Sequence, residues 1–361
     1  MPLIETMAAL RFGSGAVAPE NTKAYLFTRL GVSTITIEAT GVYRVYLIAG
    51  GGAGALGYGG NGGVVRVDVP LVAGETLEVG VGGGGNLDGH KTPSSYALRG
   101  GDGVASAGAG GDGSYIKAAV NVGRPNYSGY LAIAGGGGGS AVHAYEANLG
   151  GHGYGVGGAT WSVNWADTPS PAYSGRSAYN ATNPGAAGAG QSNGYPGGSA
   201  NIEGKLTGAN GAVASASATH GGAGGGGAGG GAGGAGGGPT GAAGNPGGKI
   251  TVTYSVAYAT GGGGGGGGHA NACGGCGAGG GILAFTGYSP AIEAWSSTSI
   301  RPTSGQLYNE FRNLVVRGQN ISNLVSTALA LGGQPDARVG GDGAVLIVPT
   351  FGTPSAFSVI S

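Results

Sequence analysis

Residues 42–54 read VYRVYLIAGGGAG and join the two kinds of sequence from which much of this chain is built. The first part, 42–48, is rich in β-branched and aromatic residues, which favour strands. The second part, 49–54, contains only glycine and alanine and offers almost no side chain to bury. Because this succession recurs along the chain, the fold depends on how strand-like segments and glycine tracts are combined.

Short runs in which apolar and polar residues alternate predict half-buried strands. In residues 64–69, for example, Val65, Val67 and Val69 would face one way, and Arg66 and Asp68 the other. Strands are expected at 34–38, 42–48, 64–69, 75–81, 115–120, 130–134, 249–256 and 344–348. We therefore expect an all-β fold, with these strands forming a β-sandwich around a modest apolar core.

The glycine tracts 135–139, 221–238 and 261–268 need a separate explanation, because ordering glycine costs more backbone entropy than ordering any other residue. An extended left-handed three-fold helix makes no internal hydrogen bonds, so its N–H and C=O groups can bond to neighbouring chains. We expect the sandwich to contain inserted polyglycine-II-like helical layers. A flexible glycine-rich linker is the alternative.

Composition excludes several classes of protein. The 361 residues include 91 glycines, and 16 basic residues balance 16 acidic ones. A chain without net positive charge is a poor nucleic-acid binder, so no nucleic-acid partner is expected. Its 40% of hydrophobic residues and its 17 tyrosines are not typical of a disordered chain. No apolar run is long enough for a membrane helix, and the first residues do not resemble a secretory signal, so no membrane insertion is expected.

The tetrapeptide Gly-Gly-Asp-Gly occurs at 100–103, 110–113 and 340–343. Asp-Gly favours turns, and apolar runs follow the second and third copies, so we interpret the motif as a turn that leads into a strand. A calcium-binding repeat would need several consecutive copies. We expect no metal site.

Residues that could carry chemistry are few, and they are scattered. Cys273 and Cys276 have the spacing of a redox motif, but glycine surrounds them, and a redox role needs a helix at the first cysteine. A local disulfide and two free thiols both remain open, and His269 is the one nearby partner for a zinc half-site. The other histidines are His90, His143, His152 and His220. We expect no enzyme and no cofactor.

Residues 143–200 form a long segment in which aromatic residues are interleaved with Asn, Ser, Pro and Gly. This composition is typical of recognition loops, because aromatic rings add contact area at low entropic cost. Alternatively, the rings cover the glycine layer. The expected receptor-binding residues are Tyr145, Tyr154, Trp161, Trp165, Tyr173 and Tyr179.

Residues 305–331 carry apolar residues at the spacing of one helical stripe, which predicts a short amphipathic α-helical insertion. The stripe comprises Leu307, Phe311, Leu314, Ile321, Val325 and Ala328. The helix would either pack on the sandwich or associate with copies of itself around a symmetry axis, as in a trimer.

The order of these segments resembles the glycine-rich domain of tail-fibre and tip proteins of tailed bacteriophages. It is also similar to the glycine-rich extracellular domain of the anaplastic lymphoma kinase family. The most specific part is VAGETLEVGV at 72–81, which runs into a glycine tract. The resemblance covers 31–349 and implies a β-sandwich with inserted polyglycine helices that presents variable loops. It leaves 350–361 as a C-terminal tail and 1–30 as an N-terminal attachment segment, although the cluster Tyr25-Leu26-Phe27 within it is also consistent with a first strand.

Three functions are consistent with the sequence. The first is a virion tail-fibre or tip adhesin, assembled in the host cytoplasm with other virion proteins, that binds a host cell-surface glycan or protein. The second is a structural virion protein, such as a head fibre, baseplate or decoration protein, without a receptor site. The third is an ice-binding protein, for which a regular Thr or Ala face would be expected.

Overall fold

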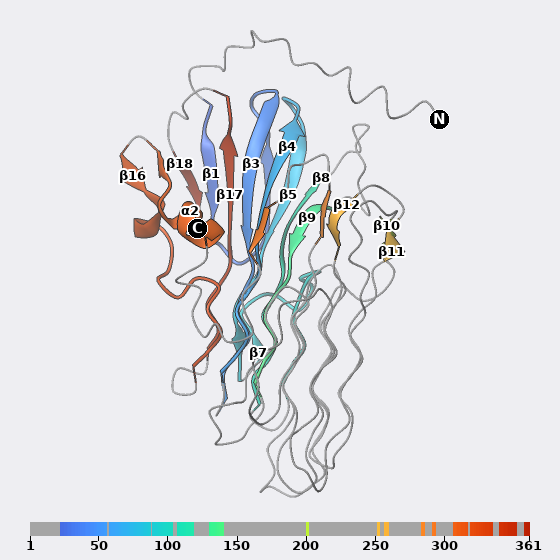
Figure 1. Cartoon of the computed structure of the whole chain (residues 1–361), viewed down its shortest axis with the longest axis vertical. Coiled ribbons are helices and arrows are strands. Elements are labelled where there is room, and N and C mark those ends of the chain that lie inside the picture. Colours follow the sequence, from blue (N-terminus) through green and yellow to red (C-terminus); the bar gives the residue numbers. More distant parts are fainter. Residues whose placement is uncertain are drawn as a thin grey trace, which may run out of the picture.

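The structure is a computed structural model, and it describes about half of the chain. It covers residues 22–55, 58–87, 89–103, 107–118, 130–140, 306–316, 318–334, 339–351 and 357–361, and also the strands at 200–201, 251–252, 256–259, 283–285 and 291–293. Strands in sheets dominate these residues, and they contain one short α-helix (Figure 1). The protein is therefore all-β, as the alternation predicted.

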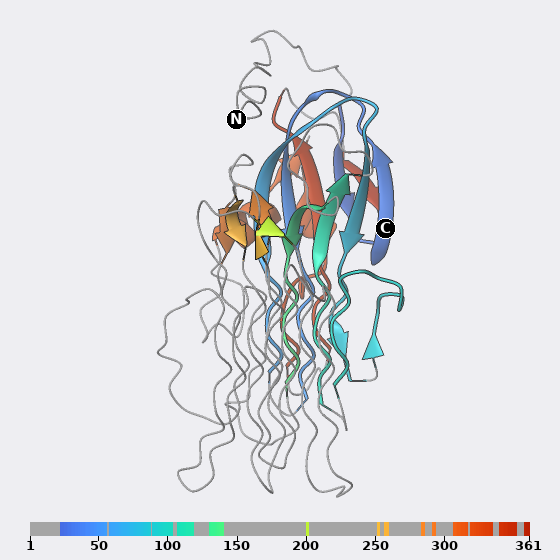
Figure 2. The same ribbon diagram turned by 90° about the vertical axis from the view of Figure 1, so that its right-hand side faces the viewer.

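Two six-stranded sheets form the body of the molecule (Figures 1 and 2). In order, the first sheet contains β14 (Ala291–Glu293), β4 (Val64–Leu71), β3 (Gly41–Ile48), β17 (Ala344–Pro349), β1 (Ala24–Phe27) and β18 (Phe357–Ile360). The second contains β12 (Val256–Ala259), β13 (Leu283–Phe285), β9 (Tyr130–Ala134), β8 (Ser114–Ala118), β5 (Thr76–Val81) and β2 (Gly31–Thr36). All neighbours in both sheets are antiparallel except β1 and β18, which run parallel.

Three small two-stranded ladders complete the described strands. These are β6 (Gly85–Asn86) with β7 (Gly89–His90), β10 (Ala200–Asn201) with β11 (Thr251–Val252), and β15 (Val315–Val316) with β16 (Gln319–Asn320). The predicted strands outside 249–256 each overlap one strand of the sheets. The predicted strand 249–256 corresponds to two separate pieces, β11 and the start of β12, which lie in different sheets.

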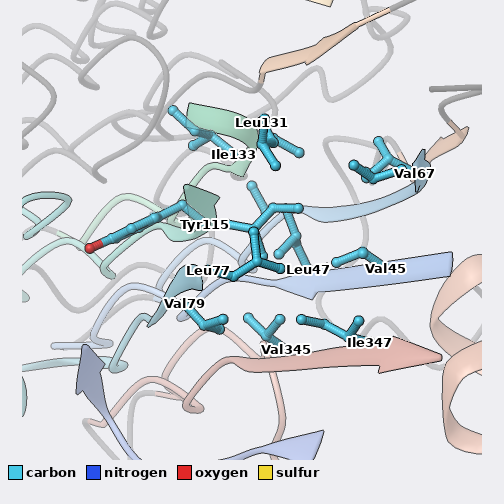
Figure 3. Close-up of a cluster of buried hydrophobic side chains, with 14 of the residues drawn as sticks. Val45, Leu47, Val67, Leu77, Val79, Tyr115, Leu131, Ile133, Val345 and Ile347 are labelled. Atoms are coloured by element: carbon cyan, nitrogen blue, oxygen red, sulfur yellow. The ribbon is translucent and has the colours of Figure 1, made fainter. Parts of the chain in front are cut away.

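The main core lies between the two sheets (Figure 3). Val45 and Leu47 of β3 point into it from one side, and Leu77 and Val79 of β5 from the other. Successive side chains of a strand point to opposite faces, so Tyr46 lies in a second buried cluster on the outer face of the first sheet. The alternation in the sequence at 75–81 predicted one face for Leu77 and Val79, and both do lie in the main core.

Strands β1 and β18 lie in the segments that were expected to be an attachment segment and a tail. The four residues of β1 are all buried, because Tyr25 and Phe27 face the main core while Leu26 joins the outer cluster. The sequence left an attachment segment and a first strand open for Tyr25-Leu26-Phe27, and the structure shows the strand. The boundaries at 30 and 350 therefore cut off two strands that belong to the first sheet.

The helix predicted over 305–331 is much shorter in the structure. Helix α2 (Gln306–Arg312) has seven residues and is followed by the β15–β16 hairpin, whose turn includes Gly318 at a φ of +79°. A 3₁₀ turn, η3 (Ile321–Asn323), comes next. The prediction was wrong because the apolar residues of the stripe lie in different local structures, and Phe311 of α2 and Ile321 of η3 reach the same buried cluster on the first sheet. The segment does pack on that sheet, as one of the two alternatives proposed.

Candidate functional site

Backbone hydrogen bonds join the glycine-rich segments that continue from the strands. Residues 49–54 follow β3 directly, and there the Gly50 N–H donates to the Asp112 carbonyl at 2.9 Å and the Ala53 N–H to the Ala109 carbonyl at 2.8 Å. One side of the segment therefore meets the same neighbour every third residue. The other segments bonded to it are 59–63, 82–85, 135–140, 332–333 and 340–341.

We call these hydrogen-bonded segments together the tract bundle. The three-residue step recurs between other pairs of segments within it. Gly60 donates to Gly138, and three residues later Gly63 donates to Gly135. In the same way Gly108 donates to Ser140 and Gly111 to Gly137. A third pair of segments is joined by Gly340 to Gly85 and Gly343 to Gly82. The tract 135–139 belongs to the bundle, whereas 221–238 and 261–268 lie outside the described residues. These lateral contacts at three-residue steps are thus made by main-chain groups.

The close approach of these backbones explains why the segments contain so much glycine. A Cβ added to Gly50 would lie 2.1 Å from the Gly83 carbonyl oxygen, and one added to Gly52 would lie 2.1 Å from that of Gly138. Real Cβ atoms do not come so close to a backbone oxygen, and neither acceptor could move without breaking bonds of its own. A side chain at these positions is therefore excluded by the neighbouring chain.

The aspartate of the second Gly-Gly-Asp-Gly motif is fully buried among donors. Asp112 Oδ1 accepts from the Gly100 N–H at 2.7 Å. Its Oδ2 accepts from the Thr92 hydroxyl at 2.6 Å and from the Gly83 N–H at 3.2 Å. A buried carboxylate is costly unless it is well hydrogen-bonded, and these donors supply that compensation.

Asp342, the aspartate of the third motif, binds the backbone amide of Gly84, the residue that follows Gly83. Asp342 Oδ1 accepts from the Gly84 N–H at 2.9 Å and from Lys91 Nζ at 2.7 Å. The consecutive amides of Gly83 and Gly84, directly after β5, are therefore bound by carboxylates from two different motifs. Both carboxylates act where a strand passes into the tract bundle.

Asp102, the aspartate of the first motif, lies beside His90, which also contacts Asp112. The His90 side chain is fully buried, with Nδ1 3.1 Å from Asp112 Oδ1 and Nε2 3.1 Å from Asp102 Oδ1. The Arg99 guanidinium lies 3.4 Å from the same Asp102 oxygen. Three consecutive residues, His90, Lys91 and Thr92, thus reach the aspartates of all three motifs. We call these six residues the motif cluster.

The sequence revealed only part of the motif cluster. Strands β8 and β17 begin directly after the second and third motifs, as predicted. The repetition of Gly-Gly-Asp-Gly was a real signal, but the motif was interpreted as a turn, whereas two of its aspartates bind backbone amides of another segment. His90 and Lys91 carried no recognisable signal, because their partners are distant in sequence. Within the described residues, no group of three or more His, Cys, Asp or Glu side chains could hold a metal ion.

A second polar group lies on the outer face of the first sheet, where α2 packs. Glu310 accepts a hydrogen bond from the Tyr46 hydroxyl, and both its oxygens accept from the Arg66 guanidinium, at 2.9 and 2.8 Å. Burial alone would raise the pKa of the Glu310 carboxyl, but the hydrogen bonds from Tyr46 and Arg66 outweigh it and lower the pKa below its usual value. This ion pair joins α2 to β3 and β4.

Tyrosines cover the outer face of the second sheet. Tyr115 lies over Gly80 of the neighbouring strand, where an added Cβ would come within 2.1 Å of the ring. Its ring packs against Tyr96 and Tyr130, and its hydroxyl donates to Glu78 at 2.7 Å. All three rings belong to the main buried cluster, in which Figure 3 labels Tyr115. These rings are nearly inaccessible to solvent and so do not form a binding face.

The receptor-binding residues expected from the sequence lie outside the described residues. They are Tyr145, Tyr154, Trp161, Trp165, Tyr173 and Tyr179, and the same holds for Cys273, Cys276 and His269. What the structure does place is the attachment point of this aromatic segment. Ser140, the last described residue before it, donates its N–H to the Ala53 carbonyl at 3.0 Å, and its Oγ accepts from the Ala55 N–H at 2.6 Å.

Neither the protein-family models nor the curated proteins gave a match to this chain. In the described part of the chain, no helix has both the length and the apolar character needed to cross a membrane.

Proposed function

We propose that this chain is a non-enzymatic virion appendage protein of a tailed bacteriophage, and that it acts as a tail-fibre or tail-tip adhesin. The observation that carries the proposal is the lateral hydrogen bonding of the tract bundle at three-residue steps. This bonding supports a polyglycine-II-like layer that extends a β-sandwich, which is the architecture that the resemblance to phage glycine-rich domains implies.

The tract bundle is suited to hold recognition loops in a fixed position. Strands β3, β5 and β9 continue without a break into 49–54, 82–85 and 135–140, so the two sheets brace one end of these segments. Ser140 is bonded to residues 53 and 55 at the point where the aromatic segment 143–200 begins. A rigid support reduces the entropy that a binding loop loses when it meets its receptor.

The proposed contacts are made by the aromatic side chains of residues 143–200. Their rings would stack on sugar rings or on an apolar receptor surface of the host cell, without chemical change to the receptor. The chain would reach the particle by assembly with other virion proteins in the host cytoplasm. A homo-oligomer such as a trimer would multiply the contacts at each appendage.

Adsorption to host cells tests the proposal. Trp161→Ala together with Trp165→Ala should reduce adsorption of otherwise intact particles at least about tenfold, because aromatic anchors dominate interface energies. Trp295→Ala, which removes the same side chain outside the aromatic segment, should leave adsorption unchanged. Equal adsorption by all variants would remove the adhesin function from these loops.

A structural virion protein without a receptor site is the second candidate. It is favoured by the fact that the described residues form a scaffold whose buried tyrosines and carboxylates are engaged within the protein. Labelling of intact particles with an antibody against this chain separates the two functions. A label at the distal tip of the tail supports the adhesin, whereas a label on the head or baseplate supports the structural role.

A further inference from the structure

Strand β2 is the outermost strand of the second sheet, and among the described residues it pairs with β5 alone. The N–H of Ile37, directly after β2, donates to the Glu75 carbonyl at 2.8 Å, so the main-chain groups of Ile37 point toward β5. Main-chain groups of successive residues point to opposite sides of an antiparallel strand. Those of Val32, Thr34 and Thr36 therefore point away from β5, along the edge of the sheet.

Nothing in the sequence of β2 blocks this edge. Natural proteins protect exposed edges with charged side chains, proline or bulges. Residues 31–36 read GVSTIT, contain neither a charge nor a proline, and pair with β5 without a bulge. The side chains of Val32, Thr34 and Thr36 are exposed, that of Val32 by 49%. Because β-branched residues favour strands, the edge is suited to pairing with a further strand.

The apolar core is incompletely covered beside this edge. Ile35 of β2 packs against the main core but stays partly exposed, and the same holds for Leu30 and for Ile360 of β18. The amides of Thr28 and Arg29 donate to the Ile360 carbonyl at 3.0 and 3.1 Å, so the end of β18 lies beside the turn that leads into β2. A strand added to β2 would remove more of the Ile35 side chain from water, which favours association.

We propose that β2 pairs antiparallel with β2 of a second copy of this chain, about a two-fold axis at Thr34. In this register the two Thr34 residues face each other, and Val32 of each copy lies opposite Thr36 of the other. Each of these residue pairs exchanges two main-chain hydrogen bonds. Ile35 lies opposite Ser33 of the second copy, and cross-strand threonine pairs add stability of their own. The pairing does not depend on the adhesin function.

Charges at the two ends of β2 favour a second copy in this orientation. Arg29 precedes the strand and Glu38 follows it, and both side chains are exposed. Antiparallel pairing brings the start of one strand to the end of the other, so Arg29 of each copy approaches Glu38 of the other. Parallel pairing would bring like charges together. Glu38 also lies 3.5 Å from Lys23 of its own chain, and this pair leaves the edge itself uncovered. The edge is therefore complementary to itself.

Sedimentation equilibrium of the full chain over a concentration series tests the pairing. The wild type should pass from a monomer of 34.1 kDa to twice that mass as the concentration rises. Val32→Lys together with Thr36→Lys sets like charges opposite each other twice, and should raise the dissociation constant about tenfold.

Val32→Lys together with Thr36→Glu is the matched control. It changes the same two exposed positions, whose neighbours on β5, Gly80 and Thr76, are uncharged. In the proposed register it sets opposite charges against each other, so it should dimerise at least as tightly as the wild type. Circular dichroism of dilute samples should show the same fold for both double variants and the wild type.

Hydrogen exchange locates the interface. The amides of Val32, Thr34 and Thr36 should become more protected as the concentration of the wild type rises, whereas the amides of β3, a central strand, should not change. In the variant with two lysines the amides of β2 should stay unprotected over the same concentrations.

Four results would overturn the proposal. The first is a wild type that stays monomeric up to about 1 mM. The second is a lysine–glutamate variant that dimerises as weakly as the variant with two lysines. The third is an oligomer in which the amides of β2 exchange as in the monomer. The fourth is protection of these amides only when another virion protein is added, which would make that protein the occupant of the edge.

Discussion

Single glycines in the tract bundle are expected to tolerate no side chain. In Gly52→Ala the new Cβ would lie 2.1 Å from the Gly138 carbonyl oxygen, so one of two hydrogen-bonded backbones must move. Overpacking of this kind costs about 1–3 kcal/mol, and we expect at least that loss in the free energy of unfolding, measured by urea denaturation.

Gly74→Ala is the matched control, because nothing lies within 4 Å of its added Cβ and its φ of +83° alone opposes the substitution. The cost there should be about 1 kcal/mol, the conformational penalty of a left-handed alanine. If the two variants lost the same stability, the contact at Gly52 would have no steric importance.

At the scale of elements, the docking of α2 should depend on pH. The Glu310 pKa is lowered in the folded protein, so its contribution to stability is complete above the ordinary glutamate pKa of about 4.3 and is lost as the pH falls through and below that value. Urea denaturation over a series of acidic pH values should show a steeper loss of stability for the wild type than for Glu310→Gln.

Glu38→Gln serves as the control, since it removes a carboxylate from the exposed Lys23–Glu38 pair and touches no helix. The pH profile of this variant should follow the wild type. A Glu310→Gln profile parallel to that of the wild type would show that the ion pair with Arg66 does not hold α2.

Elements also show what the sequence could and could not predict. Strands such as β4 and β5 were predictable because apolar and polar residues alternate along them, so period two is visible. Strand β1, buried on both faces, shows no alternation, so the sequence left it open whether Tyr25–Phe27 is a strand or part of an attachment segment. The hairpin after α2 was missed because Leu314 before it and Ile321 after it keep a helix-like spacing, while the chain changes structure around Gly318. The motif cluster depends on contacts between distant residues, and no local pattern encodes them.

For the whole molecule, buried tyrosines should link alkaline titration to unfolding. Burial raises the pKa of Tyr25, Tyr43 and Tyr130 to about 12, and burial also raises the pKa of Tyr96 and Tyr115. The neutral rings therefore stabilise the fold fully below the ordinary tyrosine pKa of about 10, and this stabilisation is lost as the pH rises toward 12.

Tyrosinate absorbance and circular dichroism, recorded together during alkaline titration, test this coupling. A fraction of the tyrosines should ionise only when the β-sheet signal collapses. If all 17 tyrosines ionised near their ordinary pKa while the sheet signal persisted, the rings would not be sealed from water as described.

The direct continuation of strands into tracts has a mechanical consequence. A strand returns a side chain to the same face every second residue, whereas bonds in the bundle repeat every third. The two periods coincide only at multiples of six residues, which correspond to about 19 Å along the chain. If such a chain slid along its length, the strand contacts and the bundle hydrogen bonds would both re-form only after six residues. We therefore expect the joined strand and tract to oppose sliding, even though most residues of the bundle are glycines.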